Sequence, residues 1–259
     1  MGNLGETIQY WMRSLPQKRE YARLRSKASH DDEIFRSLLL DGVAVVPDFM
    51  DSATVEHMKN AIPPIEECQL SPEGTRTRFY LNADHMEPLG PFFRNQLIER
   101  TMRAALGPSA MMFRAFVQYR IELGNTGAFE QFFHMDTWRP RYKAFLYLTD
   151  VDNGNGPFTY TPRTHYGVWR YRYESDVARV FRAGSNGLIN DEASAFVGCV
   201  WPHEYARVCE QRRTGPRNVT GQAGTLILFD ARGLHRIPPL EHAPRIILSS
   251  YWIREGQHS

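Results

Sequence analysis

The chain is poor in cysteine, and its three cysteines do not form a pair with metal-binding spacing. Cys68, Cys199 and Cys209 are an odd number, lie far apart, and include no CxxC pair. Neither a disulfide framework nor a thiolate zinc site is therefore indicated. We expect three free thiols in a reducing compartment, and hence a cytoplasmic protein.

The chain also lacks an excess of charge of one sign and any long apolar run. It has 31 Lys and Arg against 29 Asp and Glu, a net charge of +2. A nucleic-acid-binding domain would show a much larger basic excess, so we expect no nucleic-acid partner. No apolar run approaches the roughly 18 residues that a membrane span needs, and the first twenty residues lack the apolar core of a signal peptide. We expect no membrane association.

What is present favours one globular unit. The 259 residues are 42% hydrophobic and 23% charged, which provides for a full core and gives no case for disorder. Residues 1–110 have the composition of helices and loops, whereas residues 111–254 have that of short strands. We expect a single domain over 1–259, mainly β with helical additions.

The first part of the chain predicts four helices and one strand. Ser29 is predicted to begin an N-terminal cap, with Asp32 three places later and acids in the first turn, and Gly42 is a good C-terminal cap. The segment 65–90 has no clear pattern and is predicted to be a loop. The helices are expected over 17–28, 33–41, 52–61 and 92–106, with a strand at 43–49 between the second and the third.

The second part predicts eight short strands separated by Gly, Asn, Asp and Pro. They are expected at 111–123, 128–135, 142–149, 157–161, 217–221, 224–229, 234–237 and 245–253. This number of short strands favours a jelly roll, or double-stranded β-helix, of the cupin-like kind. An insertion at 167–215, rich in Arg and aromatic residues and partly helical, is predicted to form a lid or a pocket wall.

The triplet His134-Met135-Asp136 is the first candidate for chemistry. On a strand, residues i and i+2 point to the same face, so both side chains could reach one metal ion. A second histidine from a distant strand would complete a 2-His-1-carboxylate triad, which leaves positions on Fe(II) for substrate and O₂. Alone this motif is weak, since His30-Asp31-Asp32 also matches it where a helix is expected to begin.

The sequences around the triplet are more specific. KAFLYLTDVDNGNGPFTYTPRTHY (143–166) and AGTLILFDARGLHRIPPLEHAPRIIL (223–248) resemble motifs of the phytanoyl-CoA dioxygenase-like family of Fe(II)/2-oxoglutarate oxygenases. Residues 34–59 resemble the entry segment of that family. The resemblance implies that His134, Asp136 and His235 hold iron, and that Arg245, ten residues after His235, binds the distal carboxylate of 2-oxoglutarate. An arginine suits this role because it stays charged and binds a carboxylate with two parallel hydrogen bonds.

The chain departs from the family pattern at some positions. Relatives often carry a small hydroxyl residue where this chain has Ile237 and Ile247, and Pro-Gly-Ser-His where it has the sequence 162–165. His165 is expected to be structural rather than a fourth ligand. Other residues could replace the missing cosubstrate contacts, and we name Gln118, Thr137 and Tyr147. Gln118 and Arg120 share one face of a strand, but strand parity leaves open whether that face is the inner one.

The resemblance implies an oxygenase that uses Fe(II) and the cosubstrate 2-oxoglutarate, with O₂ and a small molecule as its other partners. Because Asp136 is present, whereas related halogenases replace it, hydroxylation is the expected outcome. Trp138, Arg139 and Arg163 are candidate substrate contacts that suit an anionic or planar compound. Three alternatives remain open: an iron oxygenase that does not use 2-oxoglutarate, a cupin-like binding protein without turnover, and a β-sandwich with chance motifs. The sequence indicates no oligomeric state.

Overall fold

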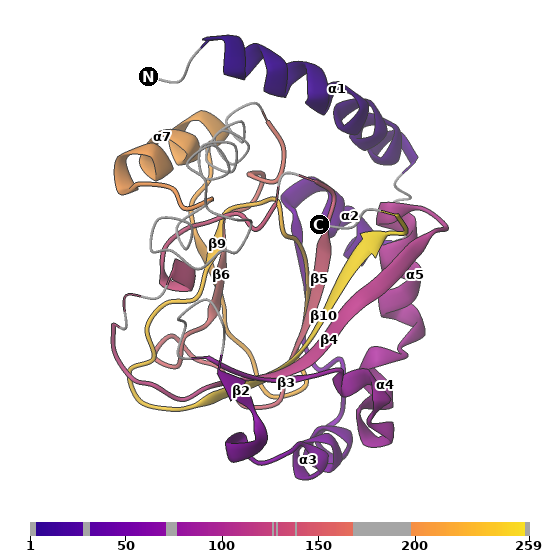
Figure 1. The fold of residues 1–259 in the computed structure, drawn as a ribbon, viewed down its shortest axis with the longest axis vertical. Coiled ribbons are helices and arrows are strands. Elements are labelled where there is room, and N and C mark those ends of the chain that lie inside the picture. The colour runs from indigo at the N-terminus through magenta and orange to yellow at the C-terminus, as the bar shows by residue number, and fades with distance from the viewer. Residues whose placement is uncertain are drawn as a thin grey trace.

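The computed structural model of the chain contains two antiparallel sheets that face each other (Figure 1). The larger sheet has seven strands in the order β1-β8-β5-β10-β4-β3-β2, and the smaller has three in the order β7-β6-β9. The structure describes residues 4–27, 32–70, 77–125, 127, 129–137, 139–167 and 198–256. The arrangement is a jelly roll with added helices, which confirms the predicted fold class.

The strands are β1 (Val43–Val46), β2 (Gln69–Leu70), β3 (Arg78–Leu81), β4 (Ala110–Arg120), β5 (Tyr142–Tyr147), β6 (Phe158–Tyr160), β7 (Arg217–Val219), β8 (Leu226–Asp230), β9 (His235–Arg236) and β10 (Arg245–Arg254). The α-helices are α1 (Leu4–Lys27), α2 (Glu33–Asp41), α3 (Ser52–Ala61), α4 (Gly90–Phe93), α5 (Gln96–Leu106) and α7 (Pro202–Arg212). Short 3₁₀ turns lie at Ile65–Glu67, Ala83–His85, Glu87–Leu89 and Phe129–Gln131. Within these described parts, no helix is both long and apolar enough to cross a membrane.

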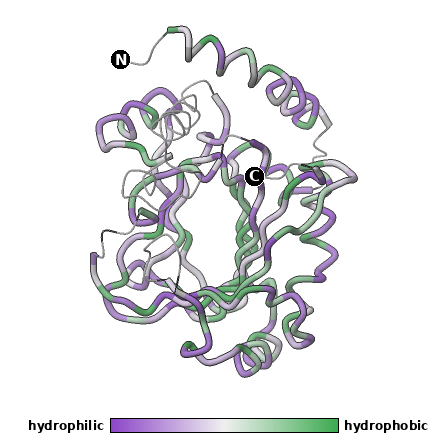
Figure 2. Tube along the Cα trace, in the orientation of Figure 1, coloured by the Kyte–Doolittle hydropathy of each residue, from purple (hydrophilic) through white to green (hydrophobic). Residues whose placement is uncertain are grey.

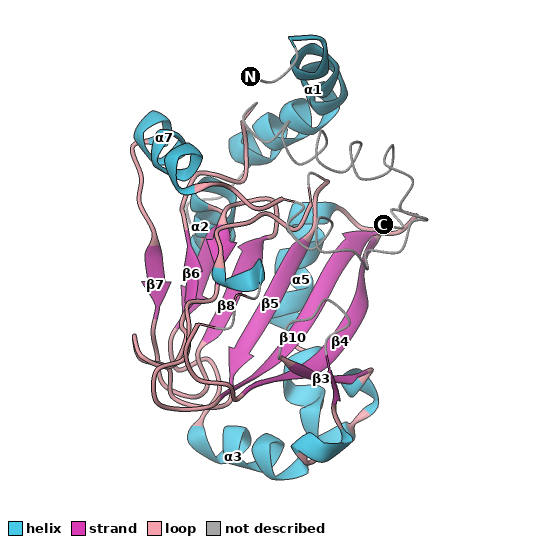
Figure 3. Cartoon of the chain, turned by 60° about the vertical axis from the view of Figure 1, so that its left-hand side comes forward, coloured by secondary structure: helices cyan, strands magenta, loops and turns pink. Residues whose placement is uncertain are grey.

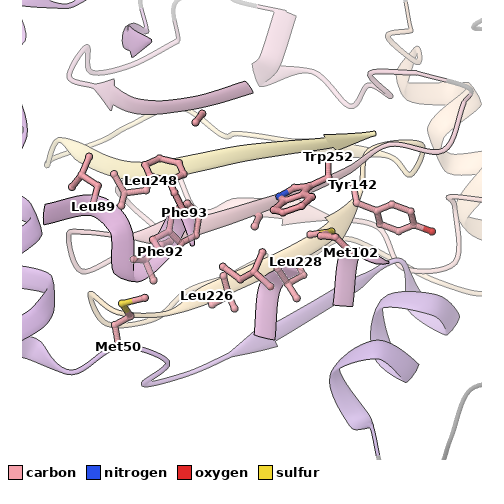
Figure 4. Packing of buried hydrophobic residues seen from close by; sticks show 14 of the residues in the cluster. Met50, Leu89, Phe92, Phe93, Met102, Tyr142, Leu226, Leu228, Leu248 and Trp252 are labelled. Atoms are coloured by element: carbon pink, nitrogen blue, oxygen red, sulfur yellow. The ribbon is translucent and has the colours of Figure 1, made fainter. Parts of the chain in front are cut away.

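The larger sheet is buried on both faces because helices cover one face and the smaller sheet covers the other (Figure 3). Leu226 and Leu228 of β8 point outward into the core beneath α2, α4 and α5, together with Trp252 of β10 (Figure 4). Ile227 and Phe229 alternate with them and point inward, toward β6 and β9. The strands of the large sheet are accordingly hydrophobic, whereas α1 and α7 carry many hydrophilic residues (Figure 2).

The helix predictions agree with the structure at α2 and α3 and need correction elsewhere. The N-terminal cap of α2 is Asp32 and not Ser29, since the Asp32 side chain accepts a hydrogen bond from the Phe35 N–H, and Gly42 ends the helix with φ +84°. The helix expected at 17–28 begins instead at Leu4. The single helix expected at 92–106 is two, because the Asn95 side chain caps a new helix at the N–H groups of residues 97 and 98.

Two expectations about strands were wrong. The segment 65–90 is not all loop, since β2 and β3 extend the large sheet and β3 pairs with β4. The strand expected at 128–135 is not formed over the described residues 129–135, where Phe129–Gln131 is a 3₁₀ turn. The turn is held by the buried Glu130, whose carboxylate pairs with Arg120 at 3.0 Å and accepts a hydrogen bond from the Thr77 hydroxyl at 2.6 Å. These long-range contacts outweigh the apolar, strand-like pattern of the segment.

The predicted insertion is described only at its two ends, because residues 168–197 lie outside the described residues. Its C-terminal end is hydrogen-bonded to the segment around His134. Residues 198–200 pair with the backbone of residues 133–135 through two hydrogen bonds, Met135 N–H to Gly198 O at 3.1 Å and Val200 N–H to Phe133 O at 2.9 Å. The helix α7 follows directly, so this end of the insertion is joined to the segment that carries the His-x-Asp motif.

Candidate metal centre

The two histidines of the candidate triad are joined through their backbones. His134 N–H donates to His235 O at 2.9 Å, and His235 N–H donates to His134 O at 3.0 Å. This isolated antiparallel bridge places both side chains on the same side, with ring centroids 4.4 Å apart. The pairing of two distant segments, rather than the strand that the sequence predicted over 128–135, brings the histidines together.

Asp136 completes the group. Its N–H donates to Ala231 O at 3.0 Å, which fixes the loop beyond the bridge. Its Oδ1 lies 3.7 Å from His134 Nε2, and its Oδ2 lies 3.3 Å from His235 Nε2. The ligand atoms of the three residues lie within 4.8 Å of one another. Two imidazole nitrogens and a carboxylate in this arrangement could hold a divalent transition metal.

Each imidazole is fixed in one tautomer. His134 Nδ1 lies 2.8 Å from Phe132 O, and His235 Nδ1 lies 2.9 Å from Gly233 O. A carbonyl oxygen only accepts, so Nδ1 carries a proton in both rings and Nε2 is the nitrogen that can offer a lone pair to a metal. Both Nε2 atoms lie beside the Asp136 carboxylate. A backbone partner on the second ring nitrogen is the usual way in which proteins orient a metal-binding histidine.

The protonation states also suit a metal. Burial and the neighbouring His235 lower the pKa of His134 to about 3, so its ring is neutral at pH 7. Burial alone would raise the pKa of Asp136, but Lys143 and His235 outweigh it and hold that pKa well below its usual range. A neutral imidazole and an ionised carboxylate are the forms that bind metal without first releasing a proton.

Lys143 is a member of this site that the sequence reasoning missed. Its Nζ lies 2.7 Å from Asp136 Oδ2, and its side chain is almost entirely buried. It lies on β5, in the segment 143–166 that resembles the family motif. A single lysine in an apolar strand does not by itself indicate a place in a metal site. An alternating strand pattern could have placed it on the inner face; its partner could not be read from spacing.

A stack of side chains supports the segment that carries His134. Phe133 lies parallel to Tyr205 of α7, with centroids 3.9 Å apart, and the Arg236 guanidinium covers the Phe133 ring at 4.6 Å. Tyr205 also shares a hydrogen bond with the Thr161 hydroxyl at 3.0 Å. The described end of the insertion therefore forms a wall against the histidine segment.

Arg245 is deeply buried and incompletely paired. It is the first residue of β10, lies opposite Arg120 of β4, and is 1% exposed. Its Nη1 donates to Gly156 O, while Nε and Nη2 have no hydrogen-bond partner among the described residues. Burial lowers its pKa to about 10, so it remains a cation at pH 7. Leaving guanidinium N–H groups unpaired in a protein interior is costly, so the site fits an anion.

The structure places the other predicted cosubstrate residues as follows. Gln118 and Tyr147 flank Ile247 in register, so all three share the inner face of the large sheet with Arg245. The Tyr147 hydroxyl is already engaged, donating to Val219 O at 2.7 Å and accepting from Phe158 N–H at 3.1 Å. Thr137 is buried next to Asp136, and its hydroxyl accepts from Arg139 N–H at 3.0 Å.

Ser249 was not predicted to take part. It is fully buried on the same face of β10 as Arg245 and Ile247. Two residues further along the strand, Tyr251 pairs with Lys143 of β5. Its hydroxyl has no hydrogen-bond partner among the described residues. Relatives were expected to carry a small hydroxyl residue at positions where this chain has isoleucine. The alternation of side chains along β10 could have identified Ser249 as a replacement.

The predicted substrate contacts are less clearly placed. Trp138 lies outside the described residues, and Arg139 is exposed beside Thr137. Arg163 adopts a left-handed conformation, with φ +64°. Its N–H donates to Asp41 O at 2.9 Å, and its guanidinium donates to Arg213 O just after α7. The roles of these three residues in substrate binding stay predictions.

Comparison with solved structures identifies the fold. HygX from Streptomyces hygroscopicus, solved with nickel and 2-oxoglutarate bound, is 16% identical, with a TM-score of 0.57 over 88% of this chain and 89% of HygX. SnoN, a non-haem 2-oxoglutarate-dependent epimerase of nogalamycin biosynthesis, is 15% identical, with a TM-score of 0.55 over 90% and 83%. EctD from S. alaskensis is 15% identical, with a TM-score of 0.58 over 87% and 79%.

The chain shares the fold of these enzymes. No family model matches the sequence, and no curated protein matches it either. The similarity therefore lies in the three-dimensional arrangement. At 15–16% sequence identity it shows a shared fold and nothing more. What the site does must be argued from its own residues.

Proposed function

We propose that the protein is an Fe(II)- and 2-oxoglutarate-dependent oxygenase that acts on a small molecule. The observation that carries the proposal is the presence of two features between the two sheets: three converging metal donors, and a buried arginine with unsatisfied N–H groups. Either feature alone also occurs in proteins that are not oxygenases. Together they match the two ends of 2-oxoglutarate, a 2-oxo acid that chelates metal and a distal carboxylate that needs a cation.

Two groups of residues would bind the metal and the cosubstrate. His134, Asp136 and His235 hold the metal, each histidine through Nε2 because Nδ1 is bound to a backbone carbonyl. Arg245 binds the distal carboxylate with the two N–H groups that no described residue uses. The bound iron, with 2-oxoglutarate, supplies the activation of O₂ that couples succinate and CO₂ release to oxidation of a substrate.

Between these two ends, the inner face offers groups that orient the cosubstrate and exclude water. Ser249 supplies a buried hydroxyl, Gln118 a buried amide, and Phe145 an apolar surface from β5. Tyr147 contributes through its ring, since its hydroxyl already donates to a carbonyl. A dry site between a metal and a fixed cation holds a dicarboxylate in one orientation.

The substrate is proposed to be a small molecule. Support comes from neighbours of the same fold: HygX has been solved with hygromycin B and SnoN with nogalamycin RO. Both similarities are at low sequence identity, so they support a small molecule as the substrate without indicating which one. With Asp136 in place as a ligand, hydroxylation is the proposed outcome, and other oxidations use the same residues.

The test is anaerobic titration of purified protein with Fe(II) and then 2-oxoglutarate, followed by measurement of succinate after O₂ is admitted. We expect a visible charge-transfer absorption from the chelated 2-oxo acid, and slow succinate release even without substrate. His235→Ala should abolish both. His242→Ala, which removes an exposed histidine paired with Asp152 at 3.3 Å, is the matched control and should abolish neither.

The possible results separate the proposal from its alternatives. Metal binding without the 2-oxoglutarate absorption would indicate an iron protein that does not use this cosubstrate. Absorption without succinate under any condition would indicate a binding protein. Absence of metal binding by the wild type would overturn the proposal as a whole.

A further inference from the structure

The lysine beside the candidate metal ligands is held in an unusual position for a charged side chain. Lys143 lies on the inner face of β5, opposite Phe229 of β8 on one side and Tyr251 of β10 on the other. It is 6% exposed. A lysine is rarely buried to this extent unless a partner compensates its charge.

Two groups compensate the ammonium of Lys143. Its Nζ lies 2.7 Å from Asp136 Oδ2 and 3.9 Å from the centroid of the Tyr251 ring. A cation over an aromatic face is attracted to the electron-rich ring, so Tyr251 holds the ammonium in place while it faces the carboxylate. Tyr251 is itself packed edge-on against Phe116, with centroids 5.0 Å apart. The lysine is therefore positioned by the sheet rather than free to swing away.

The contact is with one carboxylate oxygen in particular. Both oxygens of Asp136 face the histidines, Oδ1 at 3.7 Å from His134 Nε2 and Oδ2 at 3.3 Å from His235 Nε2. A metal ion among these groups could be bound by one oxygen or chelated by both. The ammonium of Lys143 lies against Oδ2 and competes with the metal for it.

We propose that Lys143 is a positioning residue that holds Asp136 Oδ2, so that the carboxylate gives the metal only Oδ1. The inference rests on the proposed metal site. It adds that Lys143 determines how many oxygens Asp136 gives to the metal. Three protein donors leave three positions on a six-coordinate ion, two for 2-oxoglutarate and one for O₂. A chelating carboxylate would use one of these, so the loss of Lys143 impairs cosubstrate binding more than metal binding.

The experiment uses Lys143→Met, which keeps the length of the side chain and removes its charge. Anaerobic protein is titrated with Co(II), whose visible spectrum reports coordination number, and then with 2-oxoglutarate. We expect Co(II) to bind at least as tightly as in the wild type, because a repelling cation is gone. The dissociation constant for 2-oxoglutarate should rise by about tenfold or more, which is about 1.4 kcal/mol, because a chelating carboxylate occupies a position that the cosubstrate needs.

Two further variants complete the design. Lys143→Gln has a neutral amide in place of the ammonium. It should fall between wild type and methionine, and it carries the test if the methionine variant does not fold. Lys59→Met is the matched control, since it removes a lysine from an exposed ion pair with Glu56 on α3. It should change neither titration.

The outcomes are distinguishable. A Lys143→Met protein that binds 2-oxoglutarate as the wild type does, with an unchanged Co(II) spectrum, overturns the inference and leaves the proposed function intact. Loss of Co(II) binding in that variant also overturns it, because Lys143 would then be needed to form the site at all. If the wild type binds neither Co(II) nor 2-oxoglutarate, the proposed function fails, and the inference with it.

Discussion

His134 and His235 exchange two backbone hydrogen bonds, and each ring is turned by a carbonyl two residues before it in the chain. The local geometry is the same in both cases: a Nδ1–H donates to the oxygen of residue i−2. The positions of the two donor nitrogens are thus set by backbone carbonyls rather than by the side chains of neighbouring residues. The metal donors are prepared before any ion binds, which lowers the ordering cost of binding.

Replacement of Arg245 tests the cosubstrate site. Arg245→Ala should raise the 2-oxoglutarate concentration needed for binding by roughly two orders of magnitude or more, because a buried carboxylate would lose its partner at a cost of about 3–5 kcal/mol. Arg245→Lys should rescue only part of this loss, since an ammonium lacks the planar fork. The measurement is a 2-oxoglutarate titration of Fe(II)-loaded protein. Arg103→Ala, which removes an exposed arginine paired with Glu99, is the control; equal affinity in Arg245→Ala would disprove the assignment.

Gly233 is predicted to be intolerant of a side chain. A Cβ added there would collide with the hydroxyl and ring of Tyr160, whose hydroxyl donates to Asp230 O at 3.0 Å. Gly233→Ala should destabilise the fold by about 1–3 kcal/mol and weaken metal binding, because Gly233 O orients His235. Urea unfolding and Co(II) titration measure the two effects. Tyr160→Phe removes the colliding oxygen and should restore part of both; no recovery in the double variant would show that the clash is not the cause.

The buried pair Asp230–Arg232 predicts a pH-dependent stability. Arg232 Nε lies 2.8 Å from Asp230 Oδ1, and both side chains are buried. Burial alone would raise the pKa of Asp230, but Arg232 outweighs it and holds that pKa below its usual range. A carboxyl with a lowered folded-state pKa stabilises the fold above its unfolded pKa of about 3.9, and this contribution disappears as pH falls through the folded value.

The variant Asp230→Asn should therefore lose about 3–5 kcal/mol of unfolding free energy at pH 7, where it leaves Arg232 buried without a counter-ion. Its stability should also decline less than that of the wild type as the pH is lowered below 4. Urea unfolding at pH 7, 5 and 3 measures both. Parallel pH profiles for the two proteins would contradict the role given to this pair. Asp48→Asn, which changes an exposed aspartate, serves as the control.

Much of the architecture could be predicted from the sequence because it depends on neighbouring residues. The apolar runs of β8 and β10 already indicate strands buried in a sheet, and short-range caps such as Asp51 mark where helices begin. The number of strands and the turn residues between them favoured a jelly roll, and the structure confirms it. The His134-x-Asp136 triplet, His235 and Arg245 were singled out by spacing and by family resemblance, and the structure places the first three together.

What only the tertiary structure decided is how these residues meet. The strand predicted before His134 is a 3₁₀ turn, because Glu130 is drawn to Arg120 of β4 and Thr77 before β3. The His134–His235 bridge, the Lys143–Asp136 contact and the buried Ser249 hydroxyl all depend on which strands are neighbours and in which register. Register joins residues that are far apart in the chain, and a one-residue shift would turn each of these side chains to the other face. Spacing along a sequence cannot contain that information, since it is set by the packing of two sheets against each other.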